Sequence, residues 1–581
     1  MSDDSNRFLR WGRSSHALSL LVPVGICLVL GLAGGPPFHH PDSISTQALA
    51  TVLNQGNPRF FNYPGLVIYV NAAAYGLVFL LLRMFGGPAT FQAFAEHSRS
   101  GFLPPPAAGI PFTLPGHAVA LVFSAIGLTA TWFVAYRLTR NRLTSALAVL
   151  VTGTSLLWVQ QSHMDTVDLP LAALCMLTLW LVLVWSDREH RSRPLSLALG
   201  AAVGLAASAK YNGAVVGIAI LVAALAEYRL QPRRLVPHLL FVGLGAAAAF
   251  LACNPYIFVE RGTFIGAFLY ESRHAFELGH FGYDTRTPWL EHSSALLNGA
   301  GPVPVALALV GLLFLLREPS VALAKKLAPL AFGLAFTLVV FRSILAFDRY
   351  VMPLLPLVGV LAAIGMVGLG ERVARAPAVR GFGLAVLVAA AFVPNGYRFV
   401  RHDWLLTRPD TRQLLLSLLS SEDPPVRQLL GSDYLLQWLE PLRFPTGNLQ
   451  GFAAREALAA ADLVVLDSFS VDRYVFDTFR PERRQPYAAN MNALSGYYAL
   501  SLSPYDRPKD EVPFANHSVY SPALPDLDFR TLPGPYIELY ARDVSVLTRL
   551  YESCQRLGHA CRLMEPGQGY YLRMSVADAR P

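Results

Sequence analysis

The sequence predicts an α-helical polytopic membrane protein with about 11 transmembrane helices, followed by a soluble α/β domain. Of its 581 residues, 53% are hydrophobic and only 15% are charged. Apolar runs of roughly 18 to 22 residues recur, which is the length a helix needs to cross a bilayer. After Pro394 the runs stop and charged residues become frequent. We therefore expect a transmembrane domain over residues 1–395 and a soluble domain over residues 396–581.

The first apolar run, from Ala17 to Leu32, predicts a retained membrane span. It follows Arg7, Arg10 and Arg13, as a signal peptide would. No small-residue cleavage site leads from it into a polar mature chain, however, so a removed signal peptide is not indicated.

Basic residues divide the remaining apolar runs and predict the topology. They form groups that the positive-inside rule assigns to the cytoplasm: Arg137, Arg140 and Arg142; Arg188, Arg191 and Arg193; Arg229, Arg233 and Arg234; Arg317, Lys325 and Lys326; and Arg372, Arg375 and Arg380. Joining them predicts spans near residues 17–34, 117–136, 143–161, 168–186, 195–209, 212–227, 236–253, 296–316, 327–345, 350–369 and 380–395. The amino terminus is then cytoplasmic and the soluble domain extracytoplasmic.

One further apolar run, residues 66–85, is long enough to span but is expected to lie on the outer surface. A crossing here would put every later basic group outside the cytoplasm. The run carries Tyr69, Asn71, Tyr75 and Arg83, which suit a helix in the membrane interface. We expect it inside a first outer loop, residues 35–116.

A second long outer loop, residues 254–294, is rich in charge and is expected to hold a helix near the membrane and a covering loop. In the soluble domain, residues 462–467 read as a buried strand. Residues 410–419 and 544–557 read as amphipathic helices, so an α/β fold fits.

The five cysteines are too few for a disulfide scaffold. Cys27, Cys175 and Cys253 lie in or beside apolar runs, where a buried thiol is the ordinary expectation. Cys554 and Cys561 stand in the polar tail, and their spacing alone leaves open whether they pair.

The net charge of +8 does not indicate a nucleic-acid partner. A nucleic-acid-binding surface would gather basic residues and aromatics on one soluble face, whereas here the basic residues lie between apolar runs. No Gly-rich phosphate loop precedes a cytoplasmic helix, so a nucleotide-driven mechanism is unsupported. Membrane lipids are the expected neighbours.

Polar residues collect at the predicted outer ends of the spans, where charge is costly and needs a partner or a task. They are His39, His40 and Asp42 after the first span; His163, Asp165 and Asp168 after the third; Lys210 after the fifth; and Arg342, Asp348 and Arg349 after the ninth.

For the acidic residues, structural and catalytic interpretations compete. Asp42 is either a loop carboxylate that caps a helix starting near Ser43, or a general base that removes a proton from an acceptor hydroxyl. Asp165 and Asp168 bracket a turn, where Asp168 is a plausible cap. The pair also offers two oxygen ligands to a divalent cation, although this spacing is not specific.

For the basic residues, too, two interpretations stay open. Lys210 is either a lysine reaching to the membrane face or part of an anion site. Arg349 either pairs with neighbouring Asp348 or joins Lys210 in holding a phosphate, to which arginine offers a bidentate fork. The histidines His39, His40 and His163 lack the spacing of a zinc site. Metal dependence stays open.

Several segments together resemble family 39 glycosyltransferases, which include protein O-mannosyltransferases and lipid A aminoarabinose transferases. The first is His40-Pro41-Asp42, and the others are residues 57–64, His163 with residues 168–171, and residues 204–212, 254–256 and 349–356. The matches occur in order over residues 15–395. Each is short, and the ordered set carries the resemblance.

The resemblance implies a GT-C type membrane fold and a hexosyl- or pentosyltransferase. Such an enzyme takes a sugar from a polyprenyl-phosphate donor at the extracytoplasmic face, with inversion. Asp42 matches the catalytic aspartate of the family, Asp168 with Asp165 the second acidic position, and Lys210 and Arg349 the phosphate side. Ser43 stands where many relatives carry a second carboxylate. The acceptor, whether lipid, glycan or protein, is not indicated.

Asn62, Tyr63 and Tyr69 are candidates to line the donor entrance, with membrane anchoring as the alternative for the tyrosines. Two other functions remain as alternatives. A transporter or flippase of a lipid-linked sugar would place substrate groups near the bilayer midplane between related halves, whereas the charges here lie at one face. In a membrane-anchored glycan-binding module, the soluble tail would carry the function.

Overall fold

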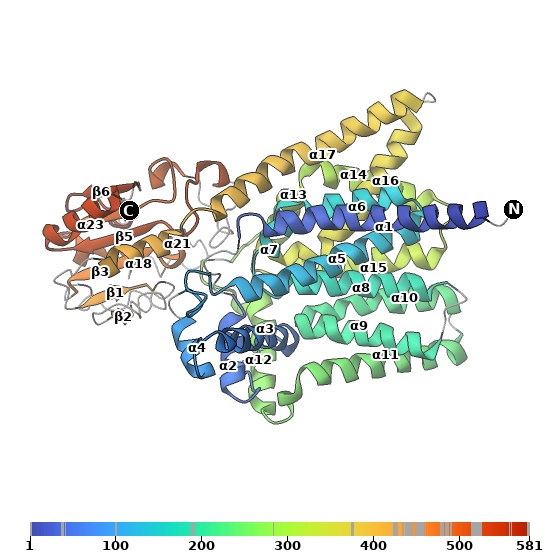
Figure 1. Ribbon diagram of the computed structural model, residues 1–581, viewed down its shortest axis with the longest axis horizontal. Helices are drawn as coiled ribbons and strands as arrows, with labels where there is room; N and C mark the ends of the chain where they lie inside the picture. Colours follow the sequence, from blue (N-terminus) through green and yellow to red (C-terminus); the bar gives the residue numbers. More distant parts are fainter. Residues whose placement is uncertain are drawn as a thin grey trace.

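A computed structural model describes most of the chain between residues 3 and 577. The residues outside this description are 1–2, 36–39, 41, 99–100, 188–191, 230, 283, 374–376, 422–427, 433–434, 436–445, 449–457, 459–460, 477–481, 483–486, 489–490, 513–525, 557, 559 and 578–581. His39, Arg188, Arg191 and Arg375 of the sequence analysis therefore lie outside it. Figure 1 shows a bundle of long, roughly aligned helices with a smaller sheet domain at one end.

Each predicted span coincides with a helix or a pair of helices. They are α1 (Asp3–Leu32), α5 (Leu114–Thr139), α6 (Arg142–Gly153) with α7 (Leu156–Ser162), α8 (Asp168–Trp185), α9 (Arg193–Ala209), η2 (Tyr211–Val216) with α10 (Gly217–Tyr228), α11 (Pro232–Cys253), α14 (Pro302–Arg317), α15 (Leu323–Val340), η5 (Asp348–Leu354) with α16 (Leu355–Val373), and α17 (Pro377–Leu406). Among the described residues, 9 helices are long and apolar enough to cross a membrane, or up to 11 if two bent pairs each count as one span. The chain is thus a multi-pass membrane protein.

Two spans are bent in ways that the sequence analysis did not anticipate. Helices α6 and α7 meet at 68°. Helix α13 (Pro288–Ala300) meets α14 at 100°, because Gly301 adopts φ +93° and Pro302 begins the next helix. The span expected at residues 296–316 therefore starts only after Gly301. Helix α17 continues past residue 395 to Leu406.

Close packing between the long helices depends on small residues, as is typical of membrane bundles. On α14, a side chain at Gly311 would collide with the carbonyl oxygen of Leu361 on α16, and Gly365 of α16 meets Leu307 of α14 in the same way. Helices α9 and α11 make the same kind of contact, where Gly200 lies against the carbonyl oxygen of Val242. These backbones can approach only because no Cβ stands between them.

Helix α3 (Gly65–Met84) is long and apolar enough to span, yet its contacts place it across one end of the bundle. Gly65 N–H donates to Asn254 Oδ1 at the end of α11 (2.7 Å). Ten residues later, or about 15 Å along the axis, Tyr75 Oη donates to the Phe112 carbonyl just before α5 (3.2 Å). The surface location expected for residues 66–85 agrees with these contacts. Helices α2 (Ser45–Leu53), α4 (Phe91–Ser98) and α12 (Arg261–Arg273) gather at the same end (Figure 1).

The opposite end of the bundle carries basic residues from separate groups. Asp187, just beyond the end of α8, pairs with Arg137 (2.5 Å) and with Lys325. Two of the predicted cytoplasmic groups therefore lie together. Asp168 begins α8 and so lies at the other end of the same helix.

The C-terminal part contains a six-stranded sheet of order β2-β1-β3-β5-β4-β6. The strands are β1 (Leu429–Gly431), β2 (Thr446–Asn448), β3 (Leu463–Asp467), β4 (Tyr498–Leu502), β5 (Ile537–Ala541) and β6 (Cys561–Met564). The pairs β1–β2 and β1–β3 are parallel, whereas β3–β5, β5–β4 and β4–β6 are antiparallel, with Val465 opposite Leu539.

Helices cover both faces of this sheet. Helices α18 (Thr411–Ser421) and α23 (Val544–Arg556) share a core with one face, and α21 (Ser468–Phe476) and α24 (Tyr570–Ala577) with the other. The predicted strand at residues 462–467 and both predicted amphipathic helices are confirmed. Cys554 and Cys561, whose pairing the spacing left open, form a disulfide between α23 and β6.

The tight α14–α16 contact predicts a specific sensitivity. Gly311→Leu forces the two backbones apart and should destabilise the protein by about 1–3 kcal/mol. The matched control is Gly243→Leu on α11, where a new Cβ would meet nothing within 4 Å. Thermal unfolding of both variants in detergent checks this, and equal melting temperatures would contradict the packing described.

Candidate active site at one end of the bundle

Four charged side chains from four segments form one continuous chain of ion pairs. Arg349 Nη2 contacts Asp42 Oδ2 across 307 residues of sequence. Arg349 Nε lies 3.2 Å from Asp168 Oδ2, and Lys210 Nζ lies 2.7 Å from Asp168 Oδ1. Asp42, Asp168, Lys210 and Arg349, predicted separately from the ends of different spans, are thus brought together.

Asp168 anchors this chain from the first turn of α8. Its side chain is only 2% exposed, and a carboxylate so buried is tolerated only with charged partners. The position at a helix N-terminus also favours negative charge. The structure assigns no cap to Asp168, because Val167 is the N-cap residue of α8. The interpretation of Asp168 as a helix cap is therefore wrong, and its oxygens serve Arg349 and Lys210.

The two cations are also held by aromatic rings. Lys210 Nζ lies 4.1 Å from the centroid of the Tyr350 ring, and Arg349 Cζ lies 4.4 Å from that of Phe347. Such rings attract cations through their negative faces. Lys210 therefore points into the site, and Arg349 reaches well beyond a local pair with Asp348.

Asp42 is the most accessible member of the chain, with 39% of its side chain exposed. Burial is the largest single influence and favours the neutral carboxyl, but Arg349, His40, Lys210 and His280 together outweigh it, so the pKa of Asp42 is lowered. The backbone N–H of Asp42 donates to His40 Nδ1 (3.0 Å). Burial lowers the pKa of His40 to about 3, so this ring is a neutral acceptor. At neutral pH the site thus presents an ionised carboxylate to a visiting molecule.

Asp165 has a different role from its neighbour Asp168. Its Oδ2 accepts hydrogen bonds from Ser45 N (3.1 Å), from Ser43 Oγ (2.5 Å) and from Ser45 Oγ at the start of α2. Gly116 of α5 allows this approach, since a Cβ there would lie 2.5 Å from that of Asp165. Burial nevertheless leaves the pKa of Asp165 raised.

One sequence-based interpretation is corrected by this arrangement. Asp165, and not Asp42, caps helix α2. Asp165 and Asp168 have separate partners, namely serines and cations, and a cation site formed by the pair stays a prediction.

The three residues expected at the donor entrance have different surroundings, and only Tyr63 interacts electrostatically with Asp42. Burial and the neighbouring Asp42 raise the pKa of Tyr63 well above its usual range, so its hydroxyl stays protonated. Asn62 Nδ2 donates to Glu271 Oε1 on α12 (2.6 Å) and so ties the first outer loop to the second.

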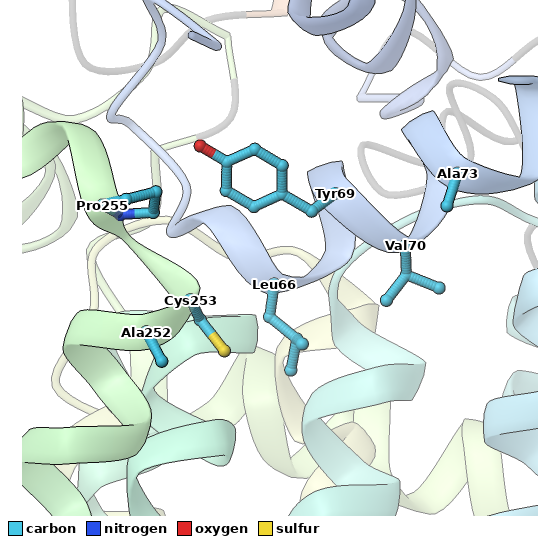
Figure 2. A pocket seen from close by; sticks show the side chains of 7 residues that line it. All are labelled: Leu66, Tyr69, Val70, Ala73, Ala252, Cys253 and Pro255. Atoms are coloured by element: carbon cyan, nitrogen blue, oxygen red, sulfur yellow. The ribbon is translucent and has the colours of Figure 1, made fainter. Parts of the chain in front are cut away.

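Tyr69 lines an apolar pocket of about 360 Å³ between the start of α3 and the end of α11. Figure 2 shows Leu66, Tyr69, Val70 and Ala73 from α3 facing Ala252, Cys253 and Pro255. Tyr69 thus lines an apolar pocket, as expected of a residue at a lipid entrance. Asn62 instead binds the first outer loop to α12 in the second.

Sequence reasoning missed two groups near the charges. Tyr350 was passed over because a tyrosine at a span end is usually an interface anchor, although its place next to Arg349 was a usable signal. His280, in the second outer loop, lies close enough to interact electrostatically with Asp42. Next to it, Phe281 packs against Tyr474 of α21 (ring centroids 4.7 Å apart), so the sheet domain reaches the loops around the site.

Comparisons with known proteins agree with this fold. The family described as "Dolichyl-phosphate-mannose-protein mannosyltransferase" matches residues 113–257. Among solved structures, the archaeal oligosaccharyltransferase AglB from Archaeoglobus fulgidus, in complex with an inhibitory peptide and a dolichol-phosphate, is similar at 12% identity with a TM-score of 0.51. The match covers 87% of this chain and 75% of that one.

ArnT from Cupriavidus metallidurans, bound to undecaprenyl phosphate, is also similar, at 15% identity with a TM-score of 0.47; the match covers 77% of this chain and 93% of that one. No curated protein matches the chain by sequence. On the likeness to AglB, the chain has the GT-C membrane fold, and it resembles protein O-mannosyltransferases over residues 113–257.

The serine and aspartate contacts at α2 generate a stability prediction. Asp165→Ala removes the carboxylate that accepts from the Ser45 N–H and from two hydroxyls, and it should cost about 2–3 kcal/mol. Ser43→Ala removes one hydroxyl, which donates to Asp165 and accepts a longer hydrogen bond (3.3 Å) from the Ser45 N–H, and it should cost about 1 kcal/mol. Chemical or thermal unfolding in detergent measures both, and an Asp165→Ala variant as stable as Ser43→Ala would argue against the capping role.

Proposed function

We propose that this protein is a membrane glycosyltransferase. It transfers a sugar from a polyprenyl-phosphate donor to an acceptor hydroxyl, with inversion at the anomeric carbon, at the extracytoplasmic face. The observation that carries the proposal is the ion-pair chain, in which the accessible Asp42 carboxylate lies against Arg349 while Asp168 and Lys210 complete the network. The mannosyltransferase family match supports sugar transfer. A protein of the same fold solved with a dolichol-phosphate supports a lipid carrier.

The proposed reaction is a single displacement. The acceptor oxygen attacks the anomeric carbon while Asp42 takes its proton. The bond between that carbon and the phosphate oxygen breaks, and the polyprenyl phosphate leaves with the electron pair. Arg349 and Lys210 stabilise the negative charge that develops on the leaving phosphate, since fixed cations are most effective where charge appears.

Donor binding would also activate the base. Without a donor, Arg349 holds the pKa of Asp42 down. A phosphate that engages the guanidinium weakens this influence, because part of its charge is then neutralised by another anion. Asp42 becomes a stronger base only when the sugar to be attacked is present.

The lipid part of the donor would arrive sideways from the bilayer. The apolar pocket beside Tyr69 lies between α3 and α11, and the stretch from Tyr63 to Leu66 connects it to the charged site. Helix α3 crosses the end of the bundle and would separate lipid from water there. The basic groups at the opposite end favour an extracytoplasmic site by the positive-inside rule.

Removing the base tests the reaction directly. Asp42→Asn keeps the shape of the side chain but cannot accept a proton, so transfer should fall by about two to four orders of magnitude. The measurement is product formation from radiolabelled polyprenyl-phosphate sugars by purified protein with a membrane extract. Yield and melting temperature control for folding. An active Asn variant, or movement of the labelled lipid across vesicles without any glycosylated product, would refute the mechanism.

Replacing the bridging arginine tests phosphate binding. Arg349→Lys keeps the charge but loses the fork that reaches both Asp42 and Asp168, so kcat/KM for the donor should fall about 100-fold. Arg372→Lys is the matched control, because Arg372 is exposed and stacks on Phe314 at the other end of α16. Equal donor kinetics for the two variants would remove Arg349 from the phosphate site.

A further inference from the structure

A cluster of buried ligand-type side chains lies where the bundle meets the sheet domain. Its members are His163, in the loop after α7, and His402 and Asp403, in the last turns of α17; we name it the junction cluster. All three are buried, and their ligand atoms lie within 4.8 Å of one another. In the part of the chain that the structure describes, no other group of three or more His, Cys, Asp or Glu residues has this geometry.

The surroundings of His163 call for a cation. Its Nδ1 lies 2.8 Å from the Val159 carbonyl oxygen, which fits an N–H donor. A neutral imidazole carries one N–H only, so Nε2 then holds a lone pair. Yet Nε2 faces the Ala33 carbonyl oxygen at 2.7 Å and Asp403 Oδ1 at 3.9 Å. With either tautomer, a neutral His163 ring therefore leaves one nitrogen lone pair facing a carbonyl oxygen.

His402 supplies a second, independent observation. Its Nδ1 lies 3.1 Å from Asp403 Oδ1. Its Nε2 is buried and has no hydrogen-bond partner, which is an unfavourable state for a polar atom. A proton added to His163 would relieve the contacts around that ring but would leave this nitrogen of His402 unsatisfied.

We infer that the junction cluster binds a divalent transition-metal ion of the zinc type. Two imidazoles and one carboxylate are ligands that zinc prefers. The contact between His163 Nδ1 and the Val159 carbonyl is the outer hydrogen bond that orients a ligating histidine. The other ring nitrogen of His163, Nε2, faces the carboxylate of Asp403. His402 provides its Nε2, which has no hydrogen-bond partner.

The ion would fasten two segments that are distant in sequence, at a point where the end of a third segment, α1, packs against them. Gly34, just after α1, adopts φ +81°, and a Cβ there would lie 2.5 Å from the Asp403 carbonyl oxygen, so α1 and α17 end against each other. His163 holds the loop that continues to Asp168. The metal ion is therefore a structural clamp between the connecting helix α17 and the loop that carries the catalytic site.

Helix α17 in turn holds the sheet domain. Tyr397 Oη donates to Asp528 Oδ1 (2.8 Å), and Arg401 Nη2 donates to the Arg530 carbonyl (2.5 Å). Leu405 packs with Leu527 of that domain. A fixed α17 thus sets where the sheet domain stands relative to the bundle.

Metal content of the full-length protein tests the inference. After incubation with Zn²⁺ in detergent and removal of free metal, the natural protein should retain about one zinc ion per chain. His402→Gln and Asp403→Asn should retain less than about 0.2. The control is His238→Gln, which changes a buried histidine on α11 that stacks on Trp185 and also has an unpartnered Nε2; it should keep the full content. Equal zinc in His402→Gln and the natural protein would overturn the site.

A second measurement needs no variant. Cobalt-loaded natural protein should show the visible absorption of a low-coordinate Co²⁺ site, and X-ray absorption of the zinc form should show imidazole ligands. A chelator should lower the melting temperature, and added Zn²⁺ should restore it. Failure of the natural protein to retain any metal would mean that the cluster holds only a proton and would overturn the inference. Neither result depends on sugar transfer.

Discussion

The guanidinium of Arg349 is the constraint on which the organisation of the site depends. It lies between Asp42 and Asp168, and Asp168 in turn holds Lys210. A single one of these charges, placed at the end of an apolar span, would be strongly unfavourable. The two carboxylates and two cations alternate and have no net charge as a set. Burying them together therefore costs less free energy than burying any one of them alone. In the proposed reaction, the same neutrality means that the donor phosphate would compete with the carboxylates for the cations, which would link donor binding to the protonation of Asp42.

The membrane part was largely predictable because hydrocarbon imposes simple rules on a sequence. Span length follows from bilayer thickness, and the basic residues between spans mark one face. The same charge rule predicted that residues 66–85 do not span the membrane. The hydrogen bonds of α3 to Asn254 and to Phe112 agree with this prediction. The sharp bend at Gly301 was not predicted, because a glycine followed by a proline is tolerated within a membrane segment unless tertiary packing selects the bent form.

The site was only partly predictable, and the errors have a common cause. Asp42, Asp168, Lys210 and Arg349 were found because uncompensated charge at a span end requires a partner. Asp165 shares that signal, but its serine partners lie 120 and 122 residues away, a relation that no local pattern contains. The junction cluster was missed for the same reason, since two of its members lie beyond residue 395. The disulfide was left open because spacing does not specify how α23 and β6 approach.

The six residues from His163 to Asp168, which are the loop between α7 and α8 and the first residue of α8, contain three of these contacts. His163 faces the end of α17, Asp165 holds the start of α2, and Asp168 binds the cations. Each of these partners belongs to a different part of the molecule: helix α17, which leads to the sheet domain, the first outer loop, and the charged site. A short loop with three buried anchors has little freedom to move one of them alone. The sheet domain is therefore connected, through α17 and His163, to Asp168, the carboxylate that positions Arg349.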